Sequence, residues 1–246
     1  LSTKGYSRYY TFNDNAINDC IDVMWIAYET YGDQKYLERA KRGGDFIILS
    51  QLPEPQAGWA QQYDWDMKPA WARKFEPPGP NGACTARNIR TLVQLYLNTG
   101  EEKYLKPIPA AIDWLNRSRI GENLWARFYE LGTNKPLYMN KKYELVYTDD
   151  DLPTHYSFKS SYGVPSAIAF YEKVKKMGRD AYIAERDREL TAEQKRERAR
   201  RMEPDVRKII VALDEDGRWI TGSRIRCSTF NRNLQTLAQY VELVGA

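Results

Sequence analysis

The sequence predicts an all-α fold, a toroid or solenoid built from helical hairpins with a few short strands in loops. Two observations lead to this prediction: a repeated helix–turn–helix pattern and the scarcity of strand patterns. Residues 31–37 (Tyr-Gly-Asp-Gln-Lys-Tyr-Leu) are echoed by residues 99–105 (Thr-Gly-Glu-Glu-Lys-Tyr-Leu). Because a hairpin repeat buries its apolar face only against its neighbours, about three or more units are needed for a stable fold.

Each copy of this repeat has an amphipathic helix on either side of its glycine. Apolar residues recur at spacings of three and four, which is the period of a helix. Gly32 and Gly100 suit the left-handed position that ends many helices. The helices predicted around the two glycines cover residues 15–30, 35–49, 84–97 and 103–120.

Further segments extend the helical pattern to the end of the chain. Residues 11–15 (Thr-Phe-Asn-Asp-Asn) are echoed by residues 229–233 (Thr-Phe-Asn-Arg-Asn), and both open an apolar-periodic helix. Charged residues at helical spacing predict an exposed helical segment stabilised by (i, i+4) pairs. The predicted elements of this part are a helix over 161–174, the charged helical segment over 178–203, a return helix over 205–213 and a short hairpin over 137–147.

Composition narrows the class of protein. The 246 residues allow one large domain, which we expect over 1–246, and the net charge of +4 is too mild for a nucleic-acid-binding stripe. No apolar run is long enough for a membrane span. A single His and three scattered Cys argue against a zinc site. We expect a monomer without nucleic-acid or membrane partners.

The most unusual segment is residues 61–76, which places carboxylates, cations and aromatic rings together without a helical or strand period. Aromatic faces beside Arg and Lys suit a sugar that bears an acid group, because the ring face stacks and the cation binds the carboxylate. We therefore expect Lys68 and Arg73 to bind such carboxylates. The alternative is a surface loop whose tryptophans enter the core.

Four segments in register resemble pectate lyases of polysaccharide lyase family 10. The resemblance covers most of the chain and implies the (α/α) toroid of that family. The family carries a Gly-Gly-Trp-Pro-Gln-like motif ahead of the first segment, whereas only ten residues precede it here, so we expect the N-terminal portion to be lacking. The segments are 11–16 (Thr-Phe-Asn-Asp-Asn-Ala), 59–64 (Trp-Ala-Gln-Gln-Tyr-Asp), 69–76 (Pro-Ala-Trp-Ala-Arg-Lys-Phe-Glu) and 125–130 (Trp-Ala-Arg-Phe-Tyr-Glu).

The resemblance implies calcium-assisted β-elimination of polygalacturonate to unsaturated oligogalacturonides, in a secreted or periplasmic protein. The proton at C5 is removed and the glycosidic oxygen at C4 leaves, and calcium with cationic side chains neutralises the neighbouring carboxylate. The matching positions imply Arg127 as the base and Asp14 and Asp64 as calcium ligands, with Asp66 as a neighbour. Calcium takes oxygen ligands, which Asp supplies.

These assignments have alternatives. Asp14 also fits a carboxylate at a helix N-terminus, and Arg127 also fits a structural pair with Glu130. Because arginine stays protonated in proteins, His155 is a rival base. The acidic run at 149–151 is a rival calcium ligand.

Four further residues complete the predicted sugar-binding set. Arg232, in the echo of the first motif, is expected to bind a uronate carboxylate. Trp59 and Trp125, together with Trp71, are expected to stack on sugar rings, with core packing as the equal alternative.

Two other functions compete with the lyase. A glycoside hydrolase on the same scaffold would need two carboxylates across the cleft, one with a raised pKa, and Asp64 with Glu130 or Glu76 are the candidates. An inactive, carbohydrate-binding relative of the lyases is the other. Only elimination produces a conjugated double bond, so an ultraviolet assay separates these cases.

Overall fold

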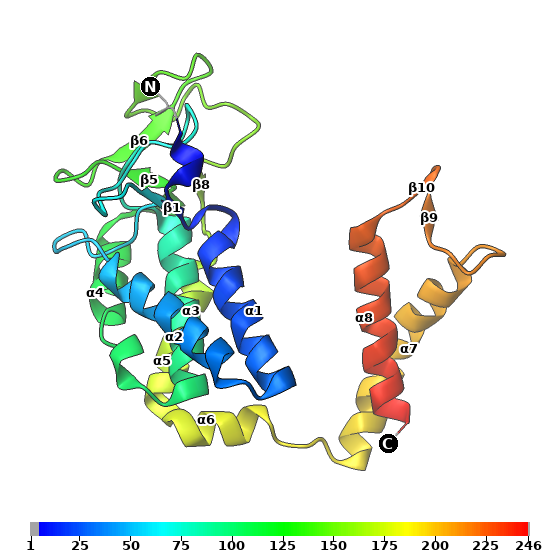
Figure 1. The fold of residues 1–246 in the computed structure, drawn as a ribbon. Coiled ribbons are helices and arrows are strands. Elements are labelled where there is room, and N and C mark those ends of the chain that lie inside the picture. Colours follow the sequence, from blue (N-terminus) through cyan, green and yellow to red (C-terminus); the bar gives the residue numbers. More distant parts are fainter. Residues whose placement is uncertain (1–4, 246) are drawn as a thin grey trace. The chain divides into compact units, whose positions relative to one another are not determined.

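The computed structural model describes residues 5–245, and most of the regular structure is helical (Figure 1). The all-α prediction with few short strands is confirmed. The α-helices of the described residues are α1 (Ala16–Tyr31), α2 (Gln34–Leu49), α3 (Gly82–Thr99), α4 (Ile108–Arg117), α5 (Val164–Met177), α6 (Arg179–Arg186), α7 (Ala192–Val211) and α8 (Cys227–Val244). Single 3-10 turns are η1 (Tyr6–Arg8), η2 (Asn13–Asn15) and η3 (Glu102–Tyr104).

The strands are short and form sheets of two or three strands. They are β1 (Tyr10–Thr11), β2 (Gln62–Tyr63), β3 (Arg119–Gly121), β4 (Leu124–Ala126), β5 (Phe128–Tyr129), β6 (Pro136–Met139), β7 (Leu145–Val146), β8 (Lys159–Ser160), β9 (Ile220–Thr221) and β10 (Arg224–Ile225). The sheets are β1–β2, β3–β4–β8, β5–β6–β7 and β9–β10, all antiparallel. The β6–β7 pair confirms the hairpin predicted over 137–147.

The chain divides into two compact units, Leu1–Ile183 and Ala184–Ala246, where the sequence led us to expect one domain. A single toroid over 1–246 stays a prediction. In the first unit α1 and α2 form a hairpin, and α3 contacts α1, α2, α4 and α5 (Figure 1). The first unit is therefore organised around α3. Among the described residues no helix combines the length and apolarity needed to cross a membrane.

The glycine turns of the repeat are confirmed. Gly32 ends α1 with φ 69° and Gly100 ends α3 with φ 75°, and each donates its N–H to the carbonyl four residues back. The long helix predicted over 103–120 is wrong, because it is split into η3 and α4. Pro107 lies at this break, and a proline lacks the N–H that a continuous helix would use.

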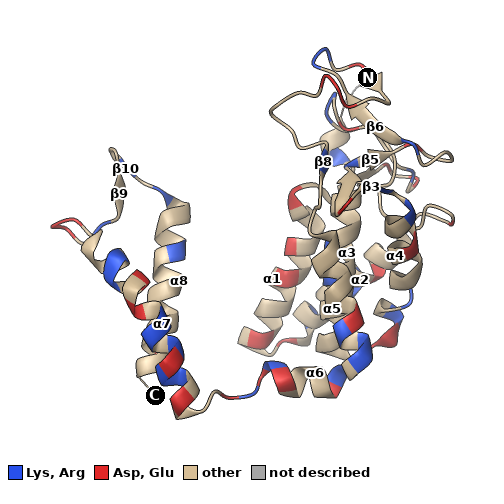
Figure 2. Ribbon diagram, turned by 180° about the vertical axis from the view of Figure 1, so that it is seen from behind, with Lys and Arg blue, Asp and Glu red and all other residues tan. Residues whose placement is uncertain are grey.

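The second unit contains a hairpin of α7 and α8, and the charged surface of α7 is visible in Figure 2. The (i, i+4) pairs Glu197–Arg201 (2.9 Å) and Glu203–Arg207 (2.5 Å) confirm the charged helical segment. Thr191 opens α7 with a capping box. The separate return helix predicted over 205–213 is wrong, because α7 runs on through Pro204 to Val211.

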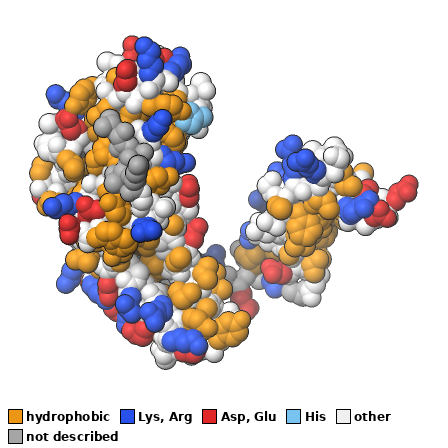
Figure 3. Space-filling view, turned by 45° about the horizontal axis from the view of Figure 1, so that its top comes forward, with side chains coloured by type: hydrophobic (Ala, Val, Ile, Leu, Met, Phe, Trp, Pro, Cys, Tyr) orange, Lys and Arg blue, Asp and Glu red, His pale blue; other side chains and the backbone are white. Residues whose placement is uncertain are grey.

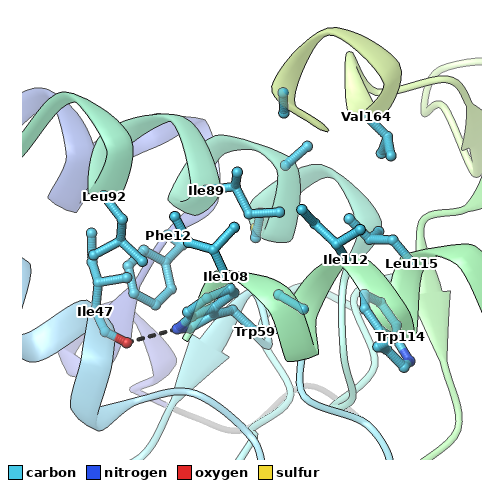
Figure 4. Packing of buried hydrophobic residues seen from close by; sticks show 14 of the residues in the cluster. Phe12, Ile47, Trp59, Ile89, Leu92, Ile108, Ile112, Trp114, Leu115 and Val164 are labelled. Carbon is cyan, nitrogen blue, oxygen red and sulfur yellow. Dashed lines mark hydrogen bonds between the residues drawn. The ribbon is translucent and has the colours of Figure 1, made fainter. Parts of the chain in front are cut away.

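The core of the first unit is built on α3 and on three fully buried tryptophans (Figure 4). Each indole N–H has an acceptor, as a buried polar group requires. Trp59 donates to the Ile47 carbonyl (2.7 Å), Trp125 to the Leu115 carbonyl (2.7 Å) and Trp114 to Asn134 Oδ1 (2.8 Å). The tryptophans therefore tie the loops to the helices.

We expect Gly79→Ala to lower the free energy of unfolding by about 3 kcal/mol. Gly79 has φ 146°, and a Cβ would lie 2.1 Å from the Tyr129 carbonyl oxygen, which is main chain and cannot rotate away. Denaturant unfolding followed by tryptophan fluorescence measures this loss. Gly121→Ala is the control, since its Cβ would meet only ordinary contacts at 3.4 Å. Equal stability of the two variants would contradict the crowding at Gly79.

Candidate functional site

The backbone of Arg127 is fixed between two buried strands. Its N–H donates to the Phe158 carbonyl (2.7 Å), and its carbonyl accepts from Gly82 N–H at the start of α3 (3.0 Å). Ala126 and Phe128 on either side are fully buried. Because the main chain is held on both edges, the Arg127 side chain leaves the strands at a defined place beside the N-terminus of α3.

The guanidinium of Arg127 lies against two tyrosine rings. Its Cζ is 4.5 Å from the ring centroid of Tyr156 and 5.8 Å from that of Tyr162. Within residues 5–245 it forms no ion pair, and its buried Nε has no hydrogen-bond partner. Aromatic faces attract a cation, but they do not satisfy its N–H donors. The head of Arg127 is therefore a half-buried cation with donors left for an anionic ligand.

A second arginine lies against the same tyrosine. Arg73 Cζ is 5.8 Å from the Tyr156 ring centroid, and its guanidinium forms a bidentate pair with Glu76, at 2.9 Å from Nε and 2.6 Å from Nη2. The Tyr156 hydroxyl donates to Glu76 Oε1 (3.1 Å). Arg127 and Arg73 thus flank one ring, as the sequence led us to expect of two cationic residues in one site.

Glu76 is the buried anchor of this arrangement, with a side chain that is 2% exposed. Burial alone would raise the pKa of Glu76, but hydrogen bonds from the Arg73 side chain and backbone outweigh it and lower the pKa. Burial raises the pKa of Tyr156, against the opposing effect of Arg127. At neutral pH the site therefore holds an ionised glutamate, a neutral tyrosine and two cations.

A cavity of about 370 Å³ adjoins this cluster and is lined in part by Asp14, Arg73 and Glu76. Asp14 lies in η2 with a left-handed backbone (φ 50°), and Tyr162 beside Arg127 also has a positive φ (47°). Such conformations are uncommon outside glycine and cluster at functional sites.

The charges gather at the N-terminus of α3. Burial raises the pKa of the Cys84 thiol, in the first turn of α3, to about 12; Arg127 acts to lower it, while Glu76 and Asp14 act to raise it. These three side chains therefore lie close enough to act on one thiol. A helix N-terminus carries partial positive charge, which adds to that of the arginines.

The predicted calcium pair is not brought together. Asp14 follows β1 and Asp64 follows β2, and these antiparallel strands leave their ladder at opposite ends. Asp64 Oδ1 accepts the backbone N–H groups of Asp66 (3.0 Å) and Lys68 (2.9 Å), so this carboxylate shapes a turn. In residues 5–245 no group of three or more His, Cys, Asp or Glu side chains could hold a metal ion. Calcium also takes amide, backbone carbonyl and water oxygens, so a calcium site stays a prediction.

The stacking role predicted for Trp59 and Trp125 is wrong in this structure. Their side chains are 0% and 1% exposed, and both indoles are hydrogen-bonded inside the core. Figure 4 shows Trp59 with its hydrogen bond to Ile47. The alternative of core packing applies, because a large apolar ring next to α3 gains more from burial than from exposure. Trp71 is partly buried against the same core.

The remaining predicted residues are scattered. Lys68 is exposed in the Asp64 turn. Arg232 belongs to α8 in the second unit, so its role beside Arg127 stays a prediction. Tyr156 and Tyr162 were not predicted, because nothing in their local sequence distinguishes a tyrosine that supports an arginine from one in a loop.

We expect Glu76→Gln to lower the free energy of unfolding at neutral pH by about 2 kcal/mol, the value of hydrogen bonds to a charged group. The lowered pKa means that the Glu76 carboxylate stabilises the fold above its ordinary pKa of 4.5, and that this stabilisation is lost as the pH falls through the folded-state pKa. The free energies of unfolding of wild type and Glu76→Gln should therefore differ at neutral pH and become equal at acid pH. Denaturant unfolding at both pH values measures this.

Glu38→Gln serves as the control, because Glu38 is 62% exposed on α2 and pairs only loosely with Lys41 (3.6 Å). If Glu76→Gln lost the same stability at every pH, Glu76 would not be the ionised carboxylate that this prediction requires.

Comparison with solved structures places the fold beside family 10 polysaccharide lyases from Cellvibrio cellulosa. A mutant of that lyase in complex with trigalacturonic acid has a TM-score of 0.56 and 20% identity, covering 72% of this chain and 65% of that chain. A second structure, of the family 10 polysaccharide lyase from Cellvibrio cellulosa, has a TM-score of 0.55 and 20% identity, covering 73% of this chain and 65% of that chain. At this identity the likeness establishes the fold, and the chain spans about 65% of the length of these structures.

A GH76 α-mannanase from Bacteroides thetaiotaomicron covers 94% of this chain and 52% of that chain at 15% identity, but its TM-score of 0.36 is too low to support an argument. No protein-family model and no curated protein matches the sequence. The fold that the sequence resemblance implied is thus like that of these lyase structures, and the activity has to be argued from the site.

Proposed function

We propose that this chain is a pectate lyase, which binds polygalacturonate and cleaves it by β-elimination to unsaturated oligogalacturonides. The observation that carries this proposal is the head of Arg127, which lies unpaired against Tyr156 with Arg73 on the same ring. In the described part of the chain, two arginines with one carboxylate partner between them leave a net positive charge, and an anionic ligand would neutralise it. The lyase motifs in the sequence and the lyase-like fold supply the class of anion, a polymer of uronates.

In this proposal Arg127 first binds the carboxylate of the uronate that reacts. Its planar fork matches a carboxylate with two parallel hydrogen bonds. Neutralising that carboxylate makes the C5 proton removable, because the negative charge that develops is already matched by fixed cations. A base, Arg127 by the family resemblance or its rival His155, accepts the C5 proton. The electron pair of the C5–H bond forms the C4–C5 double bond, and the C4–O bond breaks. The glycosidic oxygen leaves with that bond's electron pair and takes a proton from solvent, which gives the new end of the departing chain.

The role of Arg127 as the base stays a prediction that follows from the family resemblance. Arginine stays protonated in proteins, and the two tyrosine faces near Arg127 attract a cation. A neutral guanidine would therefore need further positive charge, and carboxylate binding is the role that the geometry favours. No step is assigned to calcium. Calcium dependence, secretion and a monomeric state stay predictions.

A glycoside hydrolase is less well supported. Its general acid needs a raised pKa. The pKa of Glu76 is lowered despite burial by its pairing with Arg73, and the pKa of Glu130 is lowered by hydrogen bonds from Thr133 and Tyr147. These two glutamates are thus held as carboxylates, which suits an electrostatic role and not proton donation.

The proposal is tested by incubating the chain with polygalacturonate, with and without calcium, and recording the ultraviolet absorbance of the new double bond. We expect absorbance to rise with time. Release of reducing ends without that absorbance would indicate hydrolysis. Binding without either product would make the chain a carbohydrate-binding relative, and absence of binding would overturn the proposal.

We expect Arg127→Lys to lower kcat/KM about 100-fold, because lysine keeps the charge but loses the fork. A fall in kcat with KM retained would indicate that Arg127 is the base, and a rise in KM with kcat retained would indicate ground-state carboxylate binding. Arg42→Lys, on the exposed surface of α2, is the matched control. Unchanged kinetics in Arg127→Lys would exclude Arg127 and leave His155 as the rival base.

A further inference from the structure

Three aromatic side chains form a cluster at the edge of the candidate site, which we call the aromatic rim: Phe75, Tyr143 and His155. The Phe75 and Tyr143 ring centroids are 5.9 Å apart with an interplanar angle of 32°. His155 lies edge-on to both, at 5.1 Å from Phe75 and 5.9 Å from Tyr143. The segments that carry these residues are far apart in the sequence, so the tertiary fold creates the rim.

The aromatic rim is continuous with the arginine cluster. Phe75 lies 4.7 Å from Tyr156, the ring that Arg127 and Arg73 share, and Arg73 Cζ is 4.9 Å from the Phe75 centroid. If one sugar of an acidic oligosaccharide binds the arginines through its carboxylate, the neighbouring sugar can therefore reach the aromatic rim.

The outer rings of the rim are open to solvent. Tyr143 is 38% exposed, and His155 is exposed and visible as the pale blue side chain at the surface in Figure 3. An aromatic face that lay here only for packing would gain stability from further burial. The rim instead presents ring surface next to a polar, cationic site.

The backbone of Tyr143 supplies an independent observation. Its φ is 62°, in the left-handed region that bulky side chains rarely adopt. The turn before β7 holds it there, since Tyr143 N–H donates to the Asn140 carbonyl (2.9 Å) and Glu144 N–H donates to Asn140 Oδ1 (3.0 Å). Asn or Gly would fit this position without strain. A tyrosine at a position that favours asparagine indicates that its ring has a use other than stability.

We propose that the aromatic rim is a stacking platform for a sugar ring of the acidic polysaccharide, next to the unit whose carboxylate the arginines bind. The proposal rests on the proposed function. The C–H groups on one face of a pyranose carry partial positive charge, and the face of an aromatic ring is negative, so the two attract each other. The rim takes the stacking role that buried Trp59 and Trp125 cannot fill.

The test is the affinity of Tyr143→Asn for trigalacturonate and for a longer oligogalacturonate, measured by titration calorimetry. Asparagine suits the left-handed backbone, so thermal stability should be equal to or above that of wild type. Affinity should fall about 3- to 10-fold, as the loss of one aromatic contact implies. Tyr143→Phe, which keeps the ring, should retain more affinity than Tyr143→Asn.

Tyr31→Ala is the matched control, because Tyr31 is 73% exposed at the far end of α1 from Asp14. Wild-type affinity in Tyr143→Asn, while wild type binds the oligomers, would overturn the platform alone. Absence of binding by wild type would overturn both the platform and the proposed function. Binding weakened in Tyr143→Asn without any elimination product would keep the platform and reject the lyase.

Discussion

The buried side chain of Asn81 holds together the segments on which the first unit depends. Its Oδ1 accepts the Cys84 N–H and caps α3, its Nδ2 donates to Gln61 Oε1 (3.2 Å), and its backbone N–H donates to the Trp59 carbonyl (2.7 Å). A buried amide that lost these partners would leave several polar groups unsatisfied. One residue thus fixes the start of the central helix to the loop that carries two of the lyase-like motifs.

The candidate site is connected to the hydrogen bonds of Asn81. Gln61 Oε1 also lies 3.4 Å from the Tyr156 hydroxyl, which donates to Glu76 and lies between the two arginines. On the other side, Gly82 next to Asn81 donates to the Arg127 carbonyl. Hydrogen bonds to core residues therefore fix the positions of Arg127 and Arg73. Within residues 5–245, the two cations stay close together without surface carboxylates between them. A site held this way is organised before any ligand binds.

The sequence could predict the helices because their signals are local. Apolar spacing and the glycines at 32 and 100 identified the hairpins, whereas the break at Pro107 was missed because apolar periodicity continues across it. For the site, the sequence predicted Arg127, Arg73 and Asp14, which the fold gathers around the start of α3. It misplaced Trp59 and Trp125, since an aromatic residue in a polar segment carries no information about the face that the fold will bury.

The sequence by itself thus determined the helical class, the turns of the repeat and the residue types that we propose bind an acidic sugar, because periodicity, glycine geometry and charge are properties of short stretches. Only the tertiary structure decided which side chains meet: the shared ring of Tyr156, the buried partner Glu76 and the exposed rim at Tyr143. These contacts join segments far apart in the sequence, such as Glu76 and Tyr156, which are 80 residues apart. Their geometry follows from how the helices and loops pack, which no local pattern encodes.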